Sequence, residues 1–372
     1  MIKVGVTGNN GFIGYHLSQS LKLKNDRFEL IEFNRLFFTD ESKLDDFVKK
    51  CNVIVHLAGI NRHPNPEIIY KVNVNLAEIL IESLERTNSK AHVIFSSSIH
   101  EELNNHYGSS KLKCRKILLN WSKKAGTNFS GLIIPNVFGP FCNPFYNSVV
   151  STFSHLLSIG QNPEIQVDKE LNLIYVGDLV NKILEVIELK LNSTKIQIQH
   201  TNKIFVSEIL NLLKKFNQEY RLSGKIPEFL NSFEKDLFNT FRSYINYIEH
   251  FPVKYFKNID NRGVFVEIIR NSCSGQTSFS TTKRGITRGN HFHTKKIERF
   301  AVIKGKAQIQ LRKIGSDNVL NFYLDGDSPS YVDMPVWYTH NIKNIGEEDL
   351  ITVFWIDEPY NIDKPDTYFE IV

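Results

Sequence analysis

A glycine-rich segment near the start of the chain constrains its fold more than any other feature. Ile2–Val6 is a β-branched run that predicts a strand, and the segment TGNNGFIG (residues 7–14) follows it at once and opens a predicted helix over Gly14–Leu23. Glycines permit a tight turn and let the backbone approach a pyrophosphate, which the N–H groups and dipole of a helix N-terminus attract. Because strand and helix flank the glycines in the right order, the segment predicts dinucleotide binding rather than a plain tight turn.

The first 190 residues alternate short β-branched runs with longer amphipathic stretches. This alternation predicts a doubly wound α/β domain with a parallel sheet. Further strands are expected over Phe28–Phe33, Val53–Leu57, His92–Phe95 and Gly131–Pro135, and further helices over Ile69–Arg86 and Tyr107–Lys123.

The pattern changes further along the chain. Asn192–Phe251 is rich in Leu, Phe, Lys and Asn, which predicts mostly helix with one break at Gly224 and Pro227. Short alternating strands follow over Val264–Arg270, Ala307–Leu311 and Leu350–Trp355. Such spacing is typical of an all-β sandwich or barrel, so we place a domain boundary near Phe251–Pro252.

Composition excludes several classes of protein. The 372 residues carry a formal net charge of +5, are 41% hydrophobic and include 27 Phe. Abundant aromatic residues exclude disorder as the main state. No stretch approaches the roughly 20 apolar residues of a membrane span, and the basic residues form no long run, so neither a membrane nor a nucleic acid is an expected partner. The cysteines are far apart and form no CxxC pair, which favours a reduced cytoplasmic enzyme: Cys51, Cys114, Cys142 and Cys273.

The end of the second predicted strand indicates which dinucleotide binds. An NAD enzyme needs a carboxylate near Asn34 for the ribose hydroxyls, whereas an arginine accommodates the extra phosphate of NADP. Asn34 followed by Arg35 therefore favours NADPH.

A tyrosine and a lysine four positions apart begin a predicted helix. Tyr107 and Lys111 share one helix face at this spacing. A nearby ammonium lowers the pKa of a phenol, so Tyr107 can exchange a proton with a carbonyl oxygen near neutral pH. A serine at the end of the preceding strand (residues 96–98) can hydrogen-bond the same carbonyl, which favours this chemistry over a solvated helix face.

A second cluster of candidate residues lies in the last hundred positions. His291 and His293 are two positions apart on one predicted strand, so they lie on the same face and can converge on one ion. Glu298 and His340 supply two more candidate ligands. Three imidazoles and a carboxylate suit Zn²⁺, Fe²⁺, Mn²⁺ or Ni²⁺, of which we expect zinc. The alternative is a metal-free site in which the histidines act as acid–base groups.

The N-terminal motifs resemble those of the extended short-chain dehydrogenase/reductase family, which modifies sugar nucleotides. The resemblance covers residues 1 to about 245 and rests on TGNNGFIG, HLAG (56–59), NV (73–74), YxxxK (107–111), NVFGP (136–140) and YVGD (175–178). It implies a catalytic group of Ser98, Tyr107 and Lys111, with Ser97 as the second choice of serine. It also implies substrate contacts from Asn136, Ser97 and Ser98. The implied cofactor-binding residues are Gly8, Asn10, Gly11, Phe12, Ile13, Gly14, Asn34, Arg35, Leu57, Ala58, Gly59 and Lys111.

Two departures from this family bear on the reaction. Ile99-His100 follows Ser98 where dehydratases of the family carry Thr-Asp-Glu, so we do not expect dehydration. The segment from Ser98 to Tyr107 is also short for the family, which trims one loop of the sugar pocket.

The C-terminal motifs, GxxxxxHxHxxxxExxxxxxG (285–305) and PxxxxHxxxN (335–344), resemble the signatures of the cupin superfamily, a small β-barrel. Trp337 replaces the glycine expected in the second motif. The resemblance implies that His291, His293, Glu298 and His340 bind one divalent metal ion.

The order of reductase then cupin resembles a family of bifunctional bacterial enzymes of capsule and O-antigen synthesis, over the whole chain. It implies a reductase domain over residues 1–245 and a cupin epimerase domain over residues 252–372. The cupin is expected to invert C3 of a UDP-4-keto-6-deoxy-HexNAc, and the reductase to reduce the C4 ketone with NADPH. The product would be UDP-N-acetyl-6-deoxy-L-talosamine, the precursor of UDP-N-acetyl-L-fucosamine. A homodimer is also expected.

Three alternatives stay open. The first is a sugar-nucleotide 4-epimerase with bound NAD, against which Asn34, Arg35 and the cupin argue. The second makes the cupin a non-haem iron oxygenase. The third makes the cupin a non-catalytic dimerisation or sugar-sensing module beside a lone reductase.

Overall fold

The computed structural model describes residues 1–261, 263–269, 275–358, 361–363 and 365–372. Cys273, and Arg270 at the end of one predicted strand, lie outside these described residues. The chain forms two compact units, one of Met1–Thr152 with Val167–Val206 and the other of Phe153–Gln166 with Ser207–Val372. Among the described residues, every helix falls short of the length or the apolar character that a bilayer-spanning segment needs.

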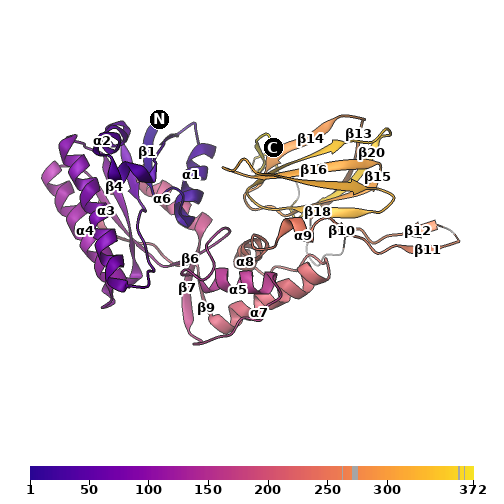
Figure 1. Ribbon diagram of the computed structural model, residues 1–372, viewed down its shortest axis with the longest axis horizontal. Helices are drawn as coiled ribbons and strands as arrows, with labels where there is room; N and C mark the ends of the chain where they lie inside the picture. The colour runs from indigo at the N-terminus through magenta and orange to yellow at the C-terminus, as the bar shows by residue number, and fades with distance from the viewer. Residues whose placement is uncertain (262, 270–274, 359–360, 364) are drawn as a thin grey trace. The chain divides into compact units, whose positions relative to one another are not determined.

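The first unit is built on a parallel six-stranded sheet with strand order β2-β1-β3-β4-β5-β8 (Figure 1). This confirms the predicted α/β class. Its strands are β1 (Ile2–Thr7), β2 (Phe28–Ile31), β3 (Val53–His56), β4 (His92–Ser98), β5 (Phe129–Ile134) and β8 (Ser193–Gln197). Its helices are α1 (Phe12–Leu23), α2 (Glu41–Lys50), α3 (Pro66–Arg86), α4 (His106–Ala125) and α6 (Val176–Glu188), with the short 3₁₀ segments η1 (Arg35–Thr39) and η2 (Ile99–Glu102).

Apolar residues bury both faces of this sheet. Helices α2, α3 and α4 contribute Phe47, Leu80 and Trp121 to one core, which also contains Phe95 of β4. Helices α1 and α6 cover the other face with a core around Leu17. A parallel sheet needs such cover on both sides, because its strands are apolar on both faces.

Local signals set the ends of the helices. The Asn105 side chain accepts a hydrogen bond from Gly108 N at 2.8 Å and caps the start of α4, which ends at Gly126 in the left-handed region. Helix α3 likewise starts with an Asn65 cap followed by Pro66. Both are ordinary start signals, because they satisfy or remove free N–H groups in the first turn.

The segment over residues 193–205 corrects the predicted helix across Asn192–Phe251. It forms β8 and then β9 (Asn202–Phe205). Strand β8 pairs with β5, and β9 joins a small sheet of order β6-β7-β9 with β6 (Asn136–Phe138) and β7 (Glu170–Tyr175). Edge pairing of this kind depends on distant partners, so the Lys- and Asn-rich segment carried no local sign of it.

The second unit begins with helices. They are the end of α5 (Val149–Ser158), then α7 (Val206–Phe216), the π-helical turn η3 (Asn217–Leu222), α8 (Ser232–Arg242) and α9 (Tyr247–His250). The predicted helical break at Gly224 and Pro227 is confirmed, since it lies between η3 and α8.

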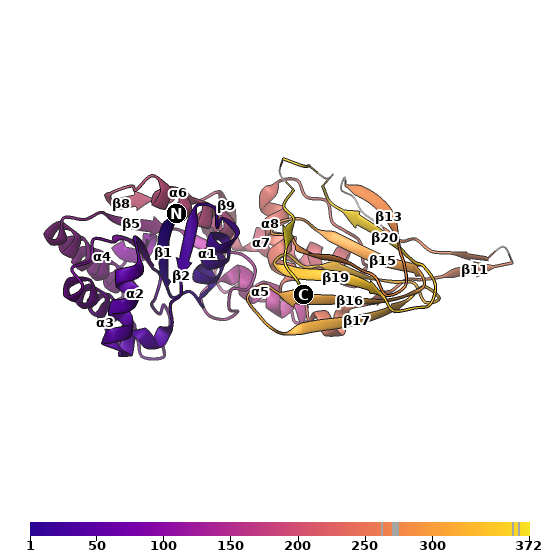
Figure 2. The ribbon, with the colours of Figure 1, turned by 90° about the horizontal axis from the view of Figure 1, so that it is seen from above.

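Two five-stranded antiparallel sheets follow, as predicted for an all-β barrel (Figure 2). One sheet has the order β10-β18-β15-β20-β13, formed by β10 (Val253–Lys254), β18 (Ser330–Met334), β15 (Glu298–Lys304), β20 (Leu350–Ile356) and β13 (Gln276–Thr282). The other has the order β17-β16-β19-β14-β21, formed by β17 (Val319–Asp325), β16 (Lys306–Lys313), β19 (Tyr338–Asn344), β14 (Thr287–Phe292) and β21 (Tyr368–Phe369).

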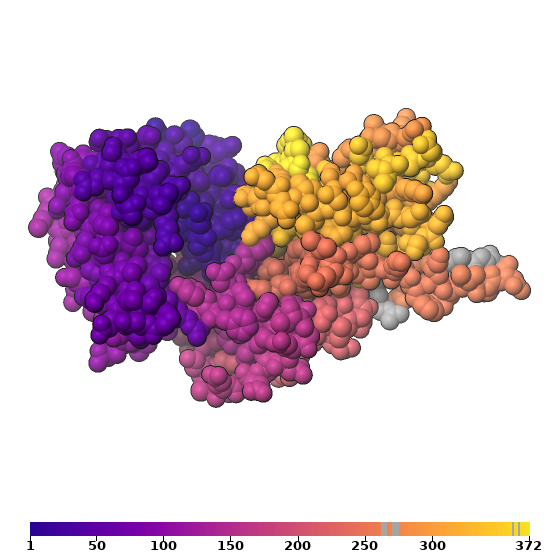
Figure 3. Space-filling view, in the orientation of Figure 1, coloured from indigo at the N-terminus to yellow at the C-terminus, as the bar shows by residue number. Residues whose placement is uncertain are grey.

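A separate hairpin of β11 (Asn258–Asp260) and β12 (Gly263–Phe265) projects from the barrel (Figures 1 and 3). The strand predicted over Val264–Arg270 corresponds to β12, which is shorter and begins one residue earlier, at Gly263. Within the described part of the chain β12 pairs with β11 alone, so no second neighbour extends it.

A buried polar network ties the helices of the second unit to the barrel. Arg299 donates two hydrogen bonds to Asp333, at 2.7 and 2.9 Å, and Tyr220 donates a third at 2.7 Å. Arg242 donates to the carbonyl of Met334 at 3.0 Å. All of these side chains are almost fully buried. In keeping with these contacts, residues from Ser207 onward group with the barrel, whereas the expected domain limits were at residues 245 and 252.

Candidate active site and metal centre

The glycine-rich turn requires glycine at two positions, at Gly8 because of its backbone conformation and at Gly14 because of close packing. Gly8 has φ +74°, and a Cβ there would lie 2.8 Å from the backbone nitrogen of Ala58. A Cβ on Gly14 would lie 2.1 Å from the carbonyl oxygen of Gly8. The turn and the start of α1 are therefore packed directly against each other, which leaves N–H groups at the helix N-terminus for an anion.

Most of the predicted reductase residues line one cavity of 410 Å³ in the first unit. They are Gly8, Gly11, Phe12, Ile13, Gly14, Leu57, Gly59, Ser97, Ser98, Tyr107, Lys111 and Asn136. They come from the ends of β1, β3 and β4 and from the segments that follow them, the edge of a parallel sheet where ligands bind.

Four predicted cofactor residues lie outside that lining. Asn10 is exposed, and Ala58 instead packs against Gly8. The Asn34 side chain accepts a hydrogen bond from Leu36 N at 2.9 Å and so caps η1. Arg35 is the first residue of η1 and is exposed. Asn34 thus has a structural task that the sequence did not indicate.

Tyr107 and Lys111 project from the first turns of α4 toward the end of β4. Lys111 donates a hydrogen bond to the carbonyl of Ser96 at 2.9 Å, and its Nζ lies 5.8 Å from the centre of the Tyr107 ring. Burial lowers the pKa of Lys111 to about 8. Burial also raises the pKa of the Tyr107 phenol, which a hydrogen bond with Ser98 opposes. The expected net lowering of the Tyr107 pKa is therefore not found, because burial outweighs the contribution of Ser98.

The neighbouring serines have different partners. Ser97 donates a hydrogen bond of 2.5 Å to the Glu101 carboxylate, which Arg115 also holds with two bonds at 2.8 and 2.9 Å. Ser98, in contrast, accepts a hydrogen bond from the backbone N–H of His100 at 3.2 Å, and its hydroxyl lowers the pKa of Tyr107. This arrangement supports Ser98 as the serine beside the reacting carbonyl. Sequence reasoning missed the Glu101–Arg115 pair, because its partners are 14 residues apart and share no periodicity.

Asn73 holds the loop that forms one wall of the cavity. Its amide nitrogen donates to Ile60 O at 2.9 Å and to Ser110 Oγ at 3.0 Å, and its oxygen accepts from Ile60 N at 2.7 Å. The side chain is buried on α3. Asn73 therefore positions the 57–60 loop against α4, which gives a physical role to the NV motif.

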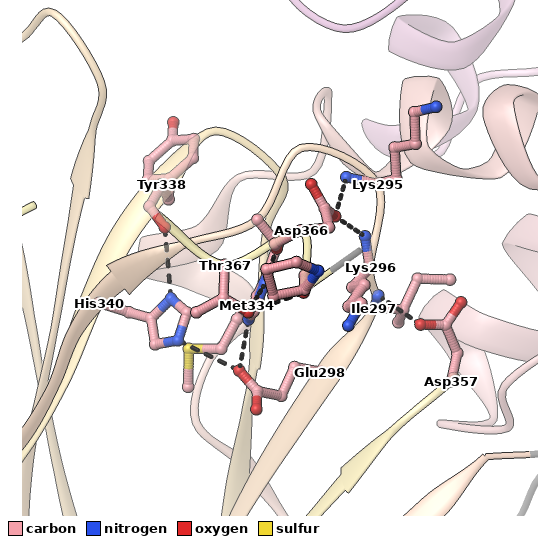
Figure 4. Close-up of polar contacts among 12 residues, drawn as sticks. Lys295, Lys296, Ile297, Glu298, Met334, Tyr338, His340, Asp357, Asp366 and Thr367 are labelled. Carbon is pink, nitrogen blue, oxygen red and sulfur yellow. Dashed lines mark hydrogen bonds and ion pairs between the residues drawn. The ribbon is translucent and has the colours of Figure 1, made fainter. Parts of the chain in front are cut away.

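The barrel brings the four predicted metal ligands together. His291 lies in β14 next to its bulge, and His293 follows the end of that strand. Glu298 is the first residue of β15, and His340 lies in β19. Their donor atoms all lie within 4.8 Å of one another. Glu298 Oε2 is 3.3 Å from His293 Nε2. It is 3.1 Å from His340 Nε2 (Figure 4).

Outer contacts fix the orientation of two of the imidazoles. His293 Nδ1 lies 2.6 Å from the carbonyl of Asp366. His340 Nδ1 lies 3.3 Å from the carbonyl of Tyr338 (Figure 4). A carbonyl only accepts, so each Nδ1 carries a proton, and each Nε2 points toward Glu298 Oε2. Among the described residues, the buried His340 Nε2 has no hydrogen-bond partner of good geometry, despite Glu298 nearby. The donor set therefore fits a divalent metal ion.

The electrostatics of this cluster agree with metal binding. Burial raises the pKa of Glu298, but hydrogen bonds from His293 and His340 outweigh it and hold that pKa below its usual range. Burial lowers the pKa of His291 to about 4. A carboxylate and a neutral imidazole are the forms that bind a metal.

The unusual Trp337 keeps the backbone geometry of the glycine it replaces. Its φ is +63°, in the left-handed region that glycine favours. The Trp337 N–H donates to the carbonyl of His293 at 2.8 Å, and its ring packs on Phe292 at 5.8 Å. Burial of the indole thus offsets a strained backbone. Asn344 donates to two backbone carbonyls and has a structural part in the turn.

These features define a nucleotide-binding α/β domain with a Ser-Tyr-Lys group, followed by a barrel with a metal-ligand cluster. The chain belongs to the NAD dependent epimerase/dehydratase family, whose model matches residues 4–198. The model of the polysaccharide biosynthesis C-terminal domain matches residues 258–368.

Relatives with known names match the whole chain. A Pseudomonas aeruginosa protein named UDP-2-acetamido-2,6-beta-L-arabino-hexul-4-ose reductase is 32% identical over 371 residues, which cover 99% of this chain and 98% of the relative. The crystal structure of the capsular polysaccharide assembling protein CapF from Staphylococcus aureus is 35% identical, with full coverage of both chains and a TM-score of 0.64.

Other matches cover part of the chain. The spore coat polysaccharide biosynthesis protein SpsL of Bacillus subtilis is 28% identical over 123 residues, 30% of this chain and 82% of that protein. RMD from Pseudomonas aeruginosa, solved with NADPH, is 19% identical and covers 59% of this chain and 83% of its own, with a TM-score of 0.54. That likeness shows the fold alone.

Proposed function

We propose that this chain is a bifunctional sugar-nucleotide enzyme. The barrel epimerises C3 of a UDP-4-keto-6-deoxy-HexNAc, and the α/β domain then reduces the C4 ketone with NADPH. The product is UDP-N-acetyl-6-deoxy-L-talosamine, a precursor of UDP-N-acetyl-L-fucosamine for capsular polysaccharide or O-antigen. The proposal includes a cytoplasmic homodimer, by resemblance to the family. It agrees with the name of the P. aeruginosa relative.

The observation that carries the reductase step is the convergence of Ser98, Tyr107 and Lys111 with the glycine-rich turn in one cavity. Bound NADPH supplies the hydride to C4. The Tyr107 phenol donates its proton to the C4 oxygen, which turns the carbonyl into an alcohol. Ser98 orients that oxygen by a hydrogen bond, and the Lys111 ammonium favours the phenolate that remains.

The exposed end of β2 supports NADPH over NADH. Arg35 is exposed at the start of η1, and no acidic side chain stands at position 34 or 35 to repel a phosphate. A guanidinium binds a phosphate well because its N–H groups match the phosphate oxygens.

The epimerase step is proposed for the His291, His293, Glu298 and His340 cluster. Those four side chains would hold one divalent ion, which we propose to be zinc. Such an ion, when bound, supplies a Lewis acid beside a carbonyl oxygen. The chain itself contributes fixed imidazoles and a carboxylate, through the backbone contacts of His293 and His340.

Deuterium exchange separates the two steps in one experiment. The full chain is incubated with UDP-4-keto-6-deoxy-HexNAc in D₂O, with and without NADPH. Without NADPH we expect deuterium at C3. With NADPH we expect a sugar that is inverted at C3 and reduced at C4, and one NADPH oxidised for each sugar reduced. Absence of exchange would rule out the epimerase, whereas absence of NADPH loss would rule out the reductase and favour a 4-epimerase with bound NAD.

A variant of the barrel tests whether the barrel itself catalyses exchange. His340→Ala in the full chain should abolish exchange, whereas Lys343→Ala, an exposed change on the same strand, should leave it intact. If His340→Ala still exchanges deuterium, the barrel is a non-catalytic module. Measurement of oxygen uptake with the iron-loaded chain separates an oxygenase from both.

A further inference from the structure

A second cavity adjoins the reductase cavity in the first unit. It has a volume of 620 Å³ and shares with the first cavity the side chains of Asn61, His100, Tyr107 and Asn147. Among the described residues, none that lines it belongs to the glycine-rich turn. Tyr107 therefore lies between two cavities. The glycine-rich turn lines the first cavity and not the second.

Most of the residues that line the second cavity have polar side chains, so it suits a ligand group that forms hydrogen bonds. Besides the shared residues it is lined by Pro66, Ile69, Asn104, Asn105, His106 and Ser109. Amides, imidazoles and a hydroxyl dominate this wall. An acetamido group can use both kinds of surface, because its amide donates and accepts and its methyl group packs against Pro66 and Ile69.

His100 is the side chain that joins the two cavities next to the reacting position. It lies in η2, two residues after Ser98, and its backbone N–H donates to Ser98 Oγ at 3.2 Å. Its ring meets the Tyr107 ring edge-on, with centroids 6.4 Å apart. Any group that His100 binds is therefore close to the carbonyl that Tyr107 protonates.

The short η2 segment is held rigidly, which gives His100 a fixed position. Glu101 is 4% exposed and binds Arg115 through two hydrogen bonds as well as Ser97. On the other side, a Cβ on Gly108 would lie 2.1 Å from the His100 carbonyl oxygen, so only glycine lets η2 pack this closely on α4. Fixed donors and acceptors discriminate between ligands better than mobile ones.

From this geometry we infer that the second cavity holds the acetamido group of the hexose, and that His100 is the residue that determines this specificity. The inference rests on the proposed function, in which the ketone lies at Tyr107. The acetamido group is two carbons from that ketone and offers one N–H and one carbonyl. Burial, and then the positive charge of Lys169, lower the pKa of His100, so its ring is neutral and can donate and accept.

Calorimetric titration of the full chain with NADP⁺ present tests the inference without requiring turnover. The probes are UDP-N-acetylglucosamine and UDP-glucose, which differ only in the acetamido group. The wild-type chain should bind the acetamido sugar about tenfold more tightly, since a hydrogen bond to a fixed partner contributes about 1 kcal/mol or slightly more. His100→Ala should reduce this preference to less than about threefold by weakening only the acetamido sugar.

Two further variants keep the test decisive. Asn104→Ala changes an exposed residue of the second cavity alone and should reduce the same preference without affecting folding. His200→Ala replaces a histidine outside both cavities and should leave the preference unchanged.

Equal binding of the two sugars by the wild-type chain would overturn the inference. It would also be overturned if His100→Ala and Asn104→Ala weakened the binding of both sugars by the same factor. Failure of the proposed function gives a different result. In that case NADPH oxidation with the keto sugar is absent, whatever the preference between the two binding probes.

Discussion

The two candidate sites of this chain are built in opposite ways. Ser98, Tyr107 and Lys111 come from one strand end and the helix after it, beside the glycine-rich turn in the same cavity. The cluster from His291 to His340 instead takes its donors from β14, the turn after it, β15 and β19. The first site depends on local spacing, and the second depends on strand pairing.

The two sites also differ in the direction in which their surroundings shift the charge of a key group. At the first site burial lowers the pKa of Lys111 to about 8, so a proton is held loosely next to Tyr107. In the barrel, hydrogen bonds from two histidines overcome burial and hold the Glu298 pKa below its usual range. One site is suited to the transfer of a proton and the other to the binding of a cation. If so, changes at one site should leave the chemistry of the other intact.

The largest expected effect is that of Tyr107→Phe. Loss of the phenol removes the proton donor, and such groups contribute about 10²–10⁴-fold, so NADPH oxidation should fall about a thousandfold. Deuterium exchange at C3 should persist. The absorbance of NADPH and mass spectrometry of the sugar measure the two. Tyr323→Phe, on an exposed tyrosine, is the control. A parallel fall in exchange would break the separation of the two sites.

Metal content should respond next most strongly, in His340→Ala. Removal of an inward-facing imidazole should weaken metal binding by more than about a hundredfold, because even outer-shell partners are worth about 10–100-fold. Elemental analysis after dialysis measures the loss, and Lys343→Ala should retain the metal. NADPH oxidation with an already epimerised keto sugar should be unaffected. If it fell as well, the sites would be coupled.

The pH profile of reduction tests the role of Lys111. Its ammonium is present below pH 8 and is lost as the pH rises through about 8. We therefore expect kcat/KM for reduction to fall above that pH by about tenfold per pH unit. Lys111→Arg keeps its charge throughout and should remove this limb, at a lower maximal rate. Persistence of the limb in that variant would assign it to another group.

The smallest effect is expected for Arg35→Ala. An exposed guanidinium–phosphate contact is worth about 1 kcal/mol, so the preference for NADPH over NADH should fall by about fivefold. The ratio of kcat/KM for the two cofactors measures this, with the exposed Arg27→Ala as the control. A wild-type preference for NADH would contradict the cofactor assignment.

Much of the first unit was predictable because its signals are local. The helix predicted over Ile69–Arg86 is observed as α3 over Pro66–Arg86, and the one predicted over Tyr107–Lys123 as α4 over His106–Ala125. Asn caps and a C-terminal glycine account for the exact ends. Strands β8 and β9 were missed, since each exists only through a partner far away in the sequence.

The two sites also show what could and could not be predicted from the sequence. The spacing of the candidate metal ligands in the sequence picked out four residues that the barrel does bring together. In contrast, Ser97 and Ser98 are equivalent in sequence, and only their partners Glu101 and Tyr107 distinguish them.

The sequence by itself determined the class of each domain, the glycine-rich turn and the residues of both clusters, because hydrophobic period and residue spacing depend on near neighbours. Tertiary structure alone decided that residues 207–251 pack with the barrel, that Asn73 holds a loop of the cavity, and that His100 faces a second, polar space. These depend on contacts between residues distant along the chain, such as Tyr220 with Asp333. Chain folding creates such contacts, and no local pattern encodes them.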